Sequence, residues 1–87
     1  MSATPEERDY NLRIAEAMIA SANAHDAAAK IVRDTANDLA GRGYNLHARK
    51  LSEVVVSMIS TVDNLREHAR QINRDPFSGI EKKVSNP

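Results

Sequence analysis

Residues 44–72 read YNLHARKLSEVVVSMISTVDNLREHARQI. Apolar and small side chains recur through this stretch at alternating steps of four and three residues, namely Tyr44, Ala48, Leu51, Val55, Met58, Val62, Leu65, Ala69 and Ile72. This spacing is typical of a helix that packs lengthwise on another helix. Val54, Ile59 and Thr61 make the stripe wider than one partner helix would cover. The stretch therefore predicts an all-α fold.

Turn-forming residues bound this second helix on both sides. Gly41-Arg42-Gly43 precedes it, and a glycine there can adopt the left-handed conformation that ends a preceding helix. Asn45 is predicted to cap the second helix, and Asp75-Pro76 is predicted to end it. The predicted organisation is a single domain, residues 1–87, made of helix 5–40, turn 41–45, helix 46–73 and tail 74–87.

The first helix begins at a capping signal. Thr4 can cap it, Pro5 suits the first helical position, and Glu7 stands where a capping box requires a carboxylate. Neither Pro nor Gly occurs between Pro5 and Ala40, which favours uninterrupted helix. Asn23 could instead cap a new helix and split this segment. Because the apolar spacing keeps its phase through Asn23, we favour one continuous helix.

The first helix carries a similar pattern built from smaller residues. The same alternation predicts a contact seam at Ile14, Met18, Ser21, His25, Ala28, Val32, Thr35 and Leu39. Beside this seam runs a column of alanines, Ala15, Ala22, Ala29 and Ala36, which lets a neighbouring backbone approach closely. The polar members Ser21, His25 and Thr35 are expected to fix the register of the helices more than they add stability.

Folding the chain about Gly43 lays the two seams together as an antiparallel hairpin, with Ile14 near Ile72 and Ala28 near Met58. The first helix would be about 54 Å long, and two helices leave one flank of each apolar stripe in water. We therefore expect two hairpins to pair into a dimeric four-helix bundle, with a monomeric three-helix bundle as the alternative. The predicted dimer or bundle seam comprises Ile14, Met18, His25, Ala28, Val32, Leu39, Leu51, Val55, Met58, Val62, Leu65 and Ile72.

Composition narrows the classes of protein further. The 87 residues include 12 Lys and Arg against 12 Asp and Glu, and no Cys. Zero net charge produces no chain-wide attraction to nucleic acid or membrane, and the lack of Cys removes disulfides and thiolate sites. The acidic start and the absence of a long apolar run argue against a signal or membrane segment, so we expect a cytoplasmic protein. The net charge is zero because an acidic first helix is balanced by a basic second half of the chain.

The sequence contains none of the motifs that indicate a glycine-rich phosphate loop, a nucleophile elbow or a zinc-protease site. His25, His47 and His68 are not three or four residues apart, so they form no helical metal pair. Carboxylates lie along the helices beside basic residues, as solvated helix faces do, and no glycine-rich phosphate loop occurs. We expect no enzymatic activity, no metal and no cofactor. A seam histidine such as His25 could make the helix interface sensitive to pH.

The most distinctive surface is a row of arginines, Arg66, Arg70 and Arg74, at steps of four residues. Arginine is favoured as an anchor for acidic protein surfaces. We expect a small helical interaction module, an adaptor or inhibitor of the kind common among short phage and mobile-element proteins, acting as a homodimer on another protein. The alternative is a dimeric nucleic-acid-binding regulator that uses the basic second helix.

Tyr10 and Phe77 complete the candidate partner-binding residues. The hairpin register leaves Tyr10 and Leu12 beyond the end of the second helix. Either the tail folds back and covers them with Phe77 and Ile80, or the tail is disordered.

Overall fold

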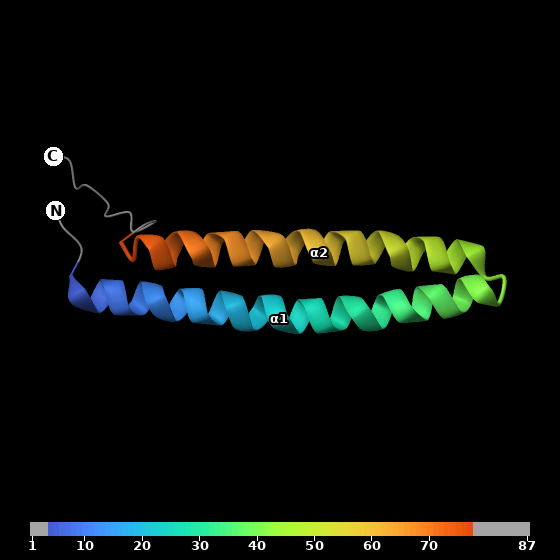
Figure 1. Cartoon of the computed structure of the whole chain (residues 1–87), viewed down its shortest axis with the longest axis horizontal. Coiled ribbons are helices and arrows are strands. Elements are labelled where there is room, and N and C mark those ends of the chain that lie inside the picture. The colour runs from blue at the N-terminus through green and yellow to red at the C-terminus, as the bar shows by residue number, and fades with distance from the viewer. Residues whose placement is uncertain (1–3, 78–87) are drawn as a thin grey trace, which may run out of the picture.

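Two long α-helices make up the computed structural model, which describes residues 4–77. Helix α1 spans Pro5–Gly41 and helix α2 spans Asn45–Arg74, against the expected ranges 5–40 and 46–73. The helices lie side by side and run in opposite directions, with the turn at one end of the hairpin (Figure 1). The predicted all-α hairpin is confirmed. Helix α1 passes through Asn23 without interruption, so the alternative of a split first helix is wrong.

The hairpin is a rod. Its radius of gyration is 18.9 Å, against about 12 Å for a compact chain of this length. Two helices in a single layer enclose little volume, and they leave both broad faces of the layer open to solvent.

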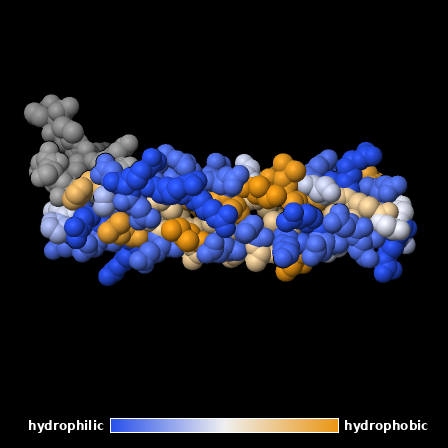
Figure 2. Space-filling view, in the orientation of Figure 1, coloured by the Kyte–Doolittle hydropathy of each residue, from blue (hydrophilic) through white to orange (hydrophobic). Residues whose placement is uncertain are grey.

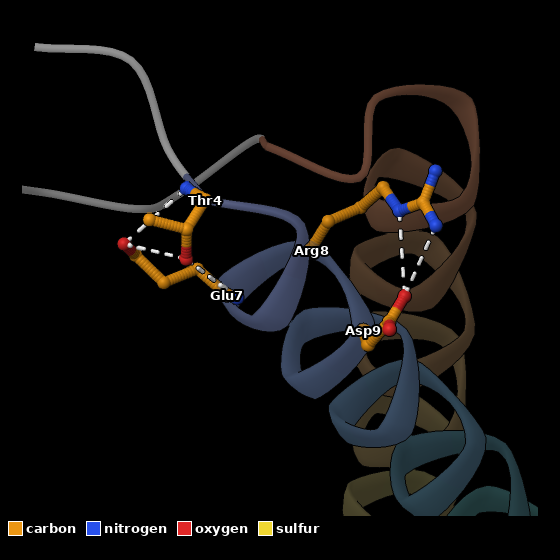
Figure 3. A network of polar contacts seen from close by, with 4 residues as sticks. All are labelled: Thr4, Glu7, Arg8 and Asp9. Atoms are coloured by element: carbon orange, nitrogen blue, oxygen red, sulfur yellow. Dashed lines mark hydrogen bonds and ion pairs between the residues drawn. The ribbon is translucent and has the colours of Figure 1, made fainter.

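The N-terminus of α1 has the capping box predicted from Thr4 and Glu7 (Figure 3). The Glu7 backbone N–H donates to Thr4 Oγ1 at 3.2 Å, and the Thr4 backbone N–H donates to Glu7 Oε1 at 3.3 Å. One turn further on, Arg8 Nη2 lies 3.2 Å from Asp9 Oδ1. The box satisfies N–H groups that have no partner within the helix.

The turn is a Schellman motif centred on Gly43. The Tyr44 N–H donates to Leu39 O at 2.9 Å, and the Gly43 N–H donates to Ala40 O at 3.1 Å. Gly43 has a φ of 89°, a value that L side chains rarely adopt. Of the two glycines proposed to end the first helix, Gly43 therefore takes the left-handed conformation, while Gly41 is the last helical residue.

The prediction that Asn45 caps the second helix is wrong. Asn45 is the first residue of α2, and the N-cap position belongs to Tyr44, which makes no side-chain capping hydrogen bond. The reason lies in the Schellman turn, which holds the Tyr44 N–H on Leu39 O. The Tyr44 carbonyl then accepts the first α2 hydrogen bond, from the Ala48 N–H at 3.0 Å.

The alanine column lies at the centre of the contact between the helices. The buried apolar residues are Ala15, Ala22, Ala29 and Ala36 of α1, with Ala48, Val55, Val62, Ala69 and Ile72 of α2. At the open end, Leu12, Ile14 and Met18 pack against a cluster of Ala15, Ala69 and Ile72. Ile14 thus packs against the cluster that contains its predicted neighbour Ile72. The absence of side chains beyond Cβ in the α1 column lets α2 lie close along it.

The close approach of the two helices determines which residues of the predicted α1 seam are buried in the contact. Of the eight positions in this seam, Thr35 is exposed. The other seven are half-buried, namely Ile14, Met18, Ser21, His25, Ala28, Val32 and Leu39. In α2, Leu51, Met58 and Leu65 are half-buried, and Tyr44 is exposed. The face of α1 turned to its partner is thus rotated by one column, from the predicted seam toward the alanines. The larger side chains flank the contact instead of forming its centre.

The open end of the hairpin is held by a residue that the sequence pattern did not single out. Asn11 is buried, and its Nδ2 donates to Pro76 O at 2.7 Å. Helix α2 ends as predicted at Asp75, whose N–H donates to Gln71 O at 3.0 Å. The bond from Asn11 ties the residues just after α2 back onto α1.

A matched pair of glycine substitutions tests the turn. A Cβ on Gly43 would force a side chain into the left-handed region, so Gly43→Ala should lower the free energy of unfolding by about 1–2 kcal/mol. Gly41 is helical, and no atom lies within 4 Å of the place a Cβ would take, so Gly41→Ala should raise it by up to ~1 kcal/mol. Urea denaturation at one fixed protein concentration measures both. Equal effects at the two positions would contradict this assignment of the turn.

A second pair tests the alanine column. Ala29→Leu places three extra carbons where α2 packs directly, so the free energy of unfolding should fall by about 1–3 kcal/mol. Ala20→Leu, on the exposed side of the same helix, should change it by less than ~0.5 kcal/mol. An Ala29→Leu variant as stable as the Ala20→Leu variant would show that the close approach is not required.

Candidate interaction surface

The hairpin has two broad faces of different chemistry. Because the helical positions recur every seven residues, each face is made of two neighbouring columns from each helix. The neutral face comprises Ile14, Ala17, Ser21, Ala24, Ala28, Ile31, Thr35 and Asp38 of α1, with His47, Lys50, Val54, Ser57, Thr61, Asn64, His68 and Gln71 of α2. The charged face comprises Leu12, Glu16, Ile19, Asn23, Asp26, Lys30, Arg33 and Asn37 of α1, with Arg49, Ser52, Val56, Ile59, Asp63, Arg66, Arg70 and Asn73 of α2.

Contacts between the helices support this division. On the charged face, Arg66 of α2 reaches α1, with its Nη2 3.3 Å from Asn23 Oδ1 and 3.6 Å from Asp26 Oδ2. A shallow groove of about 260 Å³ on the same face is lined by Ile19, Arg66, Ala69, Arg70 and Asn73. Arg66 is therefore partly committed to holding the two helices in register.

The other two arginines of the predicted row share one carboxylate. Arg70 Nη2 lies 3.1 Å from Glu67 Oε2, and Arg74 Nη2 lies 3.6 Å from Glu67 Oε1. Both guanidinium groups are well exposed, and the three residues line a shallow depression together with Asn73. The row thus divides into Arg66, which faces α1, and an exposed group of Glu67, Arg70 and Arg74 near the end of α2.

Each arginine of the row has an acidic neighbour within the chain. This lowers the net positive potential that a phosphate backbone would meet at the row. The exposed fork of a guanidinium group still offers hydrogen-bond donors to a protein carboxylate or carbonyl.

The two aromatic candidates are both accessible. Tyr10 is 66% exposed, so Phe77 does not bury it. Ile80, the other residue of the covering alternative, lies outside the described residues. Phe77 is 45% exposed, and its N–H donates to Asp75 Oδ1 at 3.2 Å. Leu12, by contrast, is half-buried against the core cluster. The structure does not join Tyr10 and Phe77 to the arginines in one patch.

The neutral face carries a groove of its own. It has a volume of about 400 Å³ and is lined by His25, Lys50, Glu53, Val54, Ser57, Met58 and Thr61. Val54 and Ile31 are exposed large apolar side chains on this face. The remaining positions are mostly small or uncharged, so apolar surface here is not interrupted by a dense set of charges.

All three histidines lie on or beside the neutral face. His25 is half-buried, and its Nδ1 lies 2.8 Å from Ser21 O, a contact in which the ring N–H donates to the carbonyl. His47 and His68 are exposed positions of α2. Within residues 4–77, no group of three or more His, Cys, Asp or Glu side chains is placed to hold a metal ion. In the same range, neither helix is long and apolar enough to cross a membrane.

Apolar side chains are also exposed elsewhere on the hairpin. Figure 2 shows one broad face, where hydrophobic patches on both helices are separated by hydrophilic side chains. On the charged face, the exposed apolar residues are Ile19, Val56 and Ile59.

One residue that holds the hairpin together and one that contributes to the charged face were missed from the sequence. Asn11 could have been found by stepping four residues back from Ala15, had the alanine column been taken as the centre of the contact. Asn23, the acceptor for Arg66, carries no such signal, because its role depends on the relative position of the two helices.

Comparison with protein-family models, with curated proteins and with solved structures gave no significant match.

Proposed function

We propose that this chain is a small, non-enzymatic helical interaction module that works as a homodimer and acts as an adaptor or inhibitor of another protein. The observation that carries the proposal is the shortage of enclosed apolar surface. The only large side chains in the described core that approach full burial are Val62 and Ile72, while Ile31 and Val54 are exposed. Association would remove such side chains from water, at about 25 cal/mol per Å² of apolar surface.

A homodimer accounts for the uncovered apolar surface better than a monomeric three-helix bundle does. Residues 4–77 form two helices, so the third helix of that alternative is missing from the described part of the chain. A hairpin that pairs with a copy of itself gains the second layer that a helical domain needs around its core.

The exposed group of Glu67, Arg70 and Arg74 supports the proposal that the homodimer binds another protein. Arg70 and Arg74 flank Glu67 at the end of α2, where their side chains can meet an acidic or carbonyl-rich surface. Binding to nucleic acid is the weaker alternative, because Asp26 and Glu67 already pair with the three arginines.

Sedimentation equilibrium at micromolar concentration tests the homodimer. The mass should be about twice the chain mass of 9.6 kDa. A single species of 9.6 kDa across the concentration range would contradict the proposal.

The protein-partner part is tested by capture from the native host. Wild-type protein and an Arg70→Ala/Arg74→Ala variant are immobilised side by side, with Arg13→Ala as a control for losing an exposed arginine elsewhere. The variant should lose a protein that the wild type and the control both retain. If all three retain the same proteins, the arginine group is not the binding surface. If the wild type instead binds generic DNA or RNA with an affinity that falls steeply with salt, the regulator alternative replaces the proposal.

A further inference from the structure

We propose that a second copy of this chain covers the neutral face, with the two-fold axis parallel to the helices, so that both turns lie at the same end of a four-helix bundle. This inference rests on the proposed homodimer and names the surface and the geometry that form it. In this arrangement, α1 of each copy stacks on α2 of the other.

The distribution of charge selects the neutral face. Among the sixteen positions that define that face, the acidic and basic residues Asp, Glu, Lys and Arg are represented by Asp38 and Lys50, and Glu53 lies beside them at the edge of the groove. The charged face holds eight charged side chains, Glu16, Asp26, Lys30, Arg33, Arg49, Asp63, Arg66 and Arg70. Covering the charged face would remove many ionised groups from water, which is strongly unfavourable for each one left without a partner. Ile19, Val56 and Ile59 are exposed on the charged face as well, but they lie among these charges.

The size and texture of the neutral face suit a second helical layer. The overlap of the two helices is about 45 Å long and about 20 Å wide, or about 900 Å² per copy, close to the ~800 Å² that each partner buries in a stable complex. Small residues such as Ala17, Ala24 and Ser57 let stacked helices approach. The groove beside Val54 and Met58 offers a hollow of about 400 Å³ for side chains of the second copy.

The two charges that remain on the neutral face determine the orientation. Asp38 lies on α1 and Lys50 lies on α2, each close to the turn, so they stand at nearly the same level of the hairpin. A two-fold axis parallel to the helices stacks α1 on the α2 of the other copy, which places each Asp38 beside the other copy's Lys50. Asp38 also pairs with Arg42 at 3.1 Å, and its side chain is 62% exposed, so the carboxylate is accessible to a second cation. With the turns at opposite ends, neither charge would meet its opposite.

The proposed orientation makes every neighbouring pair of helices antiparallel, as the arrangement with the turns at opposite ends also would, so the charge pair and not the helix dipoles selects the axis. Helices α1 and α2 are antiparallel within each copy, and the stacked α1 and α2 of different copies are antiparallel as well. Such an arrangement brings the oppositely charged ends of the helix dipoles together.

Two valines, two residues apart, provide a matched test of the face. Val54 is 46% exposed on the neutral face, and Val56 is 68% exposed on the charged face. Val54→Asp should weaken dimerisation at least tenfold in sedimentation equilibrium, and Val56→Asp should leave it within about threefold. Circular dichroism verifies that both variants keep wild-type helicity. A Val54→Asp variant that stays dimeric, or a Val56→Asp variant that dissociates, overturns the assignment of the face while the homodimer itself stands. A monomeric wild type would contradict the proposed function and this inference together.

The orientation is tested with a spin label in the turn, which leaves the core of the hairpin unchanged. Replacing Arg42 removes its ion pair with Asp38, so Asp38 keeps the proposed pairing with Lys50 of the other copy. Because the chain has no Cys, Arg42→Cys in the turn can carry a single spin label. Double electron–electron resonance should give a distance below ~30 Å between the two labels of a dimer, because both turns lie at one end. A distance of about 45–50 Å, the separation expected from the helix lengths when the turns lie at opposite ends, would overturn the proposed axis.

Discussion

The close approach of two helices along a column of alanines is the constraint on which the rest of the structure depends. Ala15, Ala22, Ala29 and Ala36 present no side chain beyond Cβ, so α2 can lie against the backbone of α1. Close approach strengthens dispersion contacts along the whole length of the hairpin. It also restricts the volume between the helices, and most of the larger apolar side chains are displaced to the flanks of the contact. The hairpin is consequently well packed at its centre and poorly covered at its sides.

The side chains on the two flanks of this contact determine the chemistry of the two broad faces. One side carries charges from both helices, and Arg66 uses two of the polar groups there to connect α2 to α1. The other side carries small, uncharged and apolar residues around Val54 and Met58. A monomer would leave this neutral face in water, whereas a second copy would cover it without removing many charges from solvent. In the proposed dimer the charged face stays outside, which leaves Arg70 and Arg74 accessible to a further protein.

Much of the hairpin could be predicted from residues whose effect is local. The capping box needs only Thr4 and Glu7, and the end of α2 needs only Asp75-Pro76, so both were predictable. The apolar spacing of α2 was equally direct, because its larger residues form one unambiguous stripe. In the turn, two glycines were equivalent by sequence, and only the backbone hydrogen bonds from Gly43 and Tyr44 distinguish them. The same bonds explain why Asn45 does not act as a cap.

The rest depends on how the two helices meet, which local patterns do not determine. In α1, the stripe through Ile14 and Met18 and the neighbouring alanine column were both suitable for the contact. The larger residues predicted the stripe as the contact surface. The dispersion energy gained when the helices approach closely favours the alanine column instead. The contacts of Asn11 with Pro76 and of Arg66 with Asn23 follow from that rotation and register.

The most direct test of the account is an isotope-filtered NOE experiment on a dimer assembled from labelled and unlabelled chains, because it detects contacts between copies without any substitution. If the alanine contact leaves the neutral face for the second copy, intermolecular NOEs should arise at the methyl groups of Val54, Met58 and Ile31. The methyl groups of Val56 and Ile59 on the charged face should show none. Intermolecular NOEs confined to Val56 and Ile59 would contradict the account.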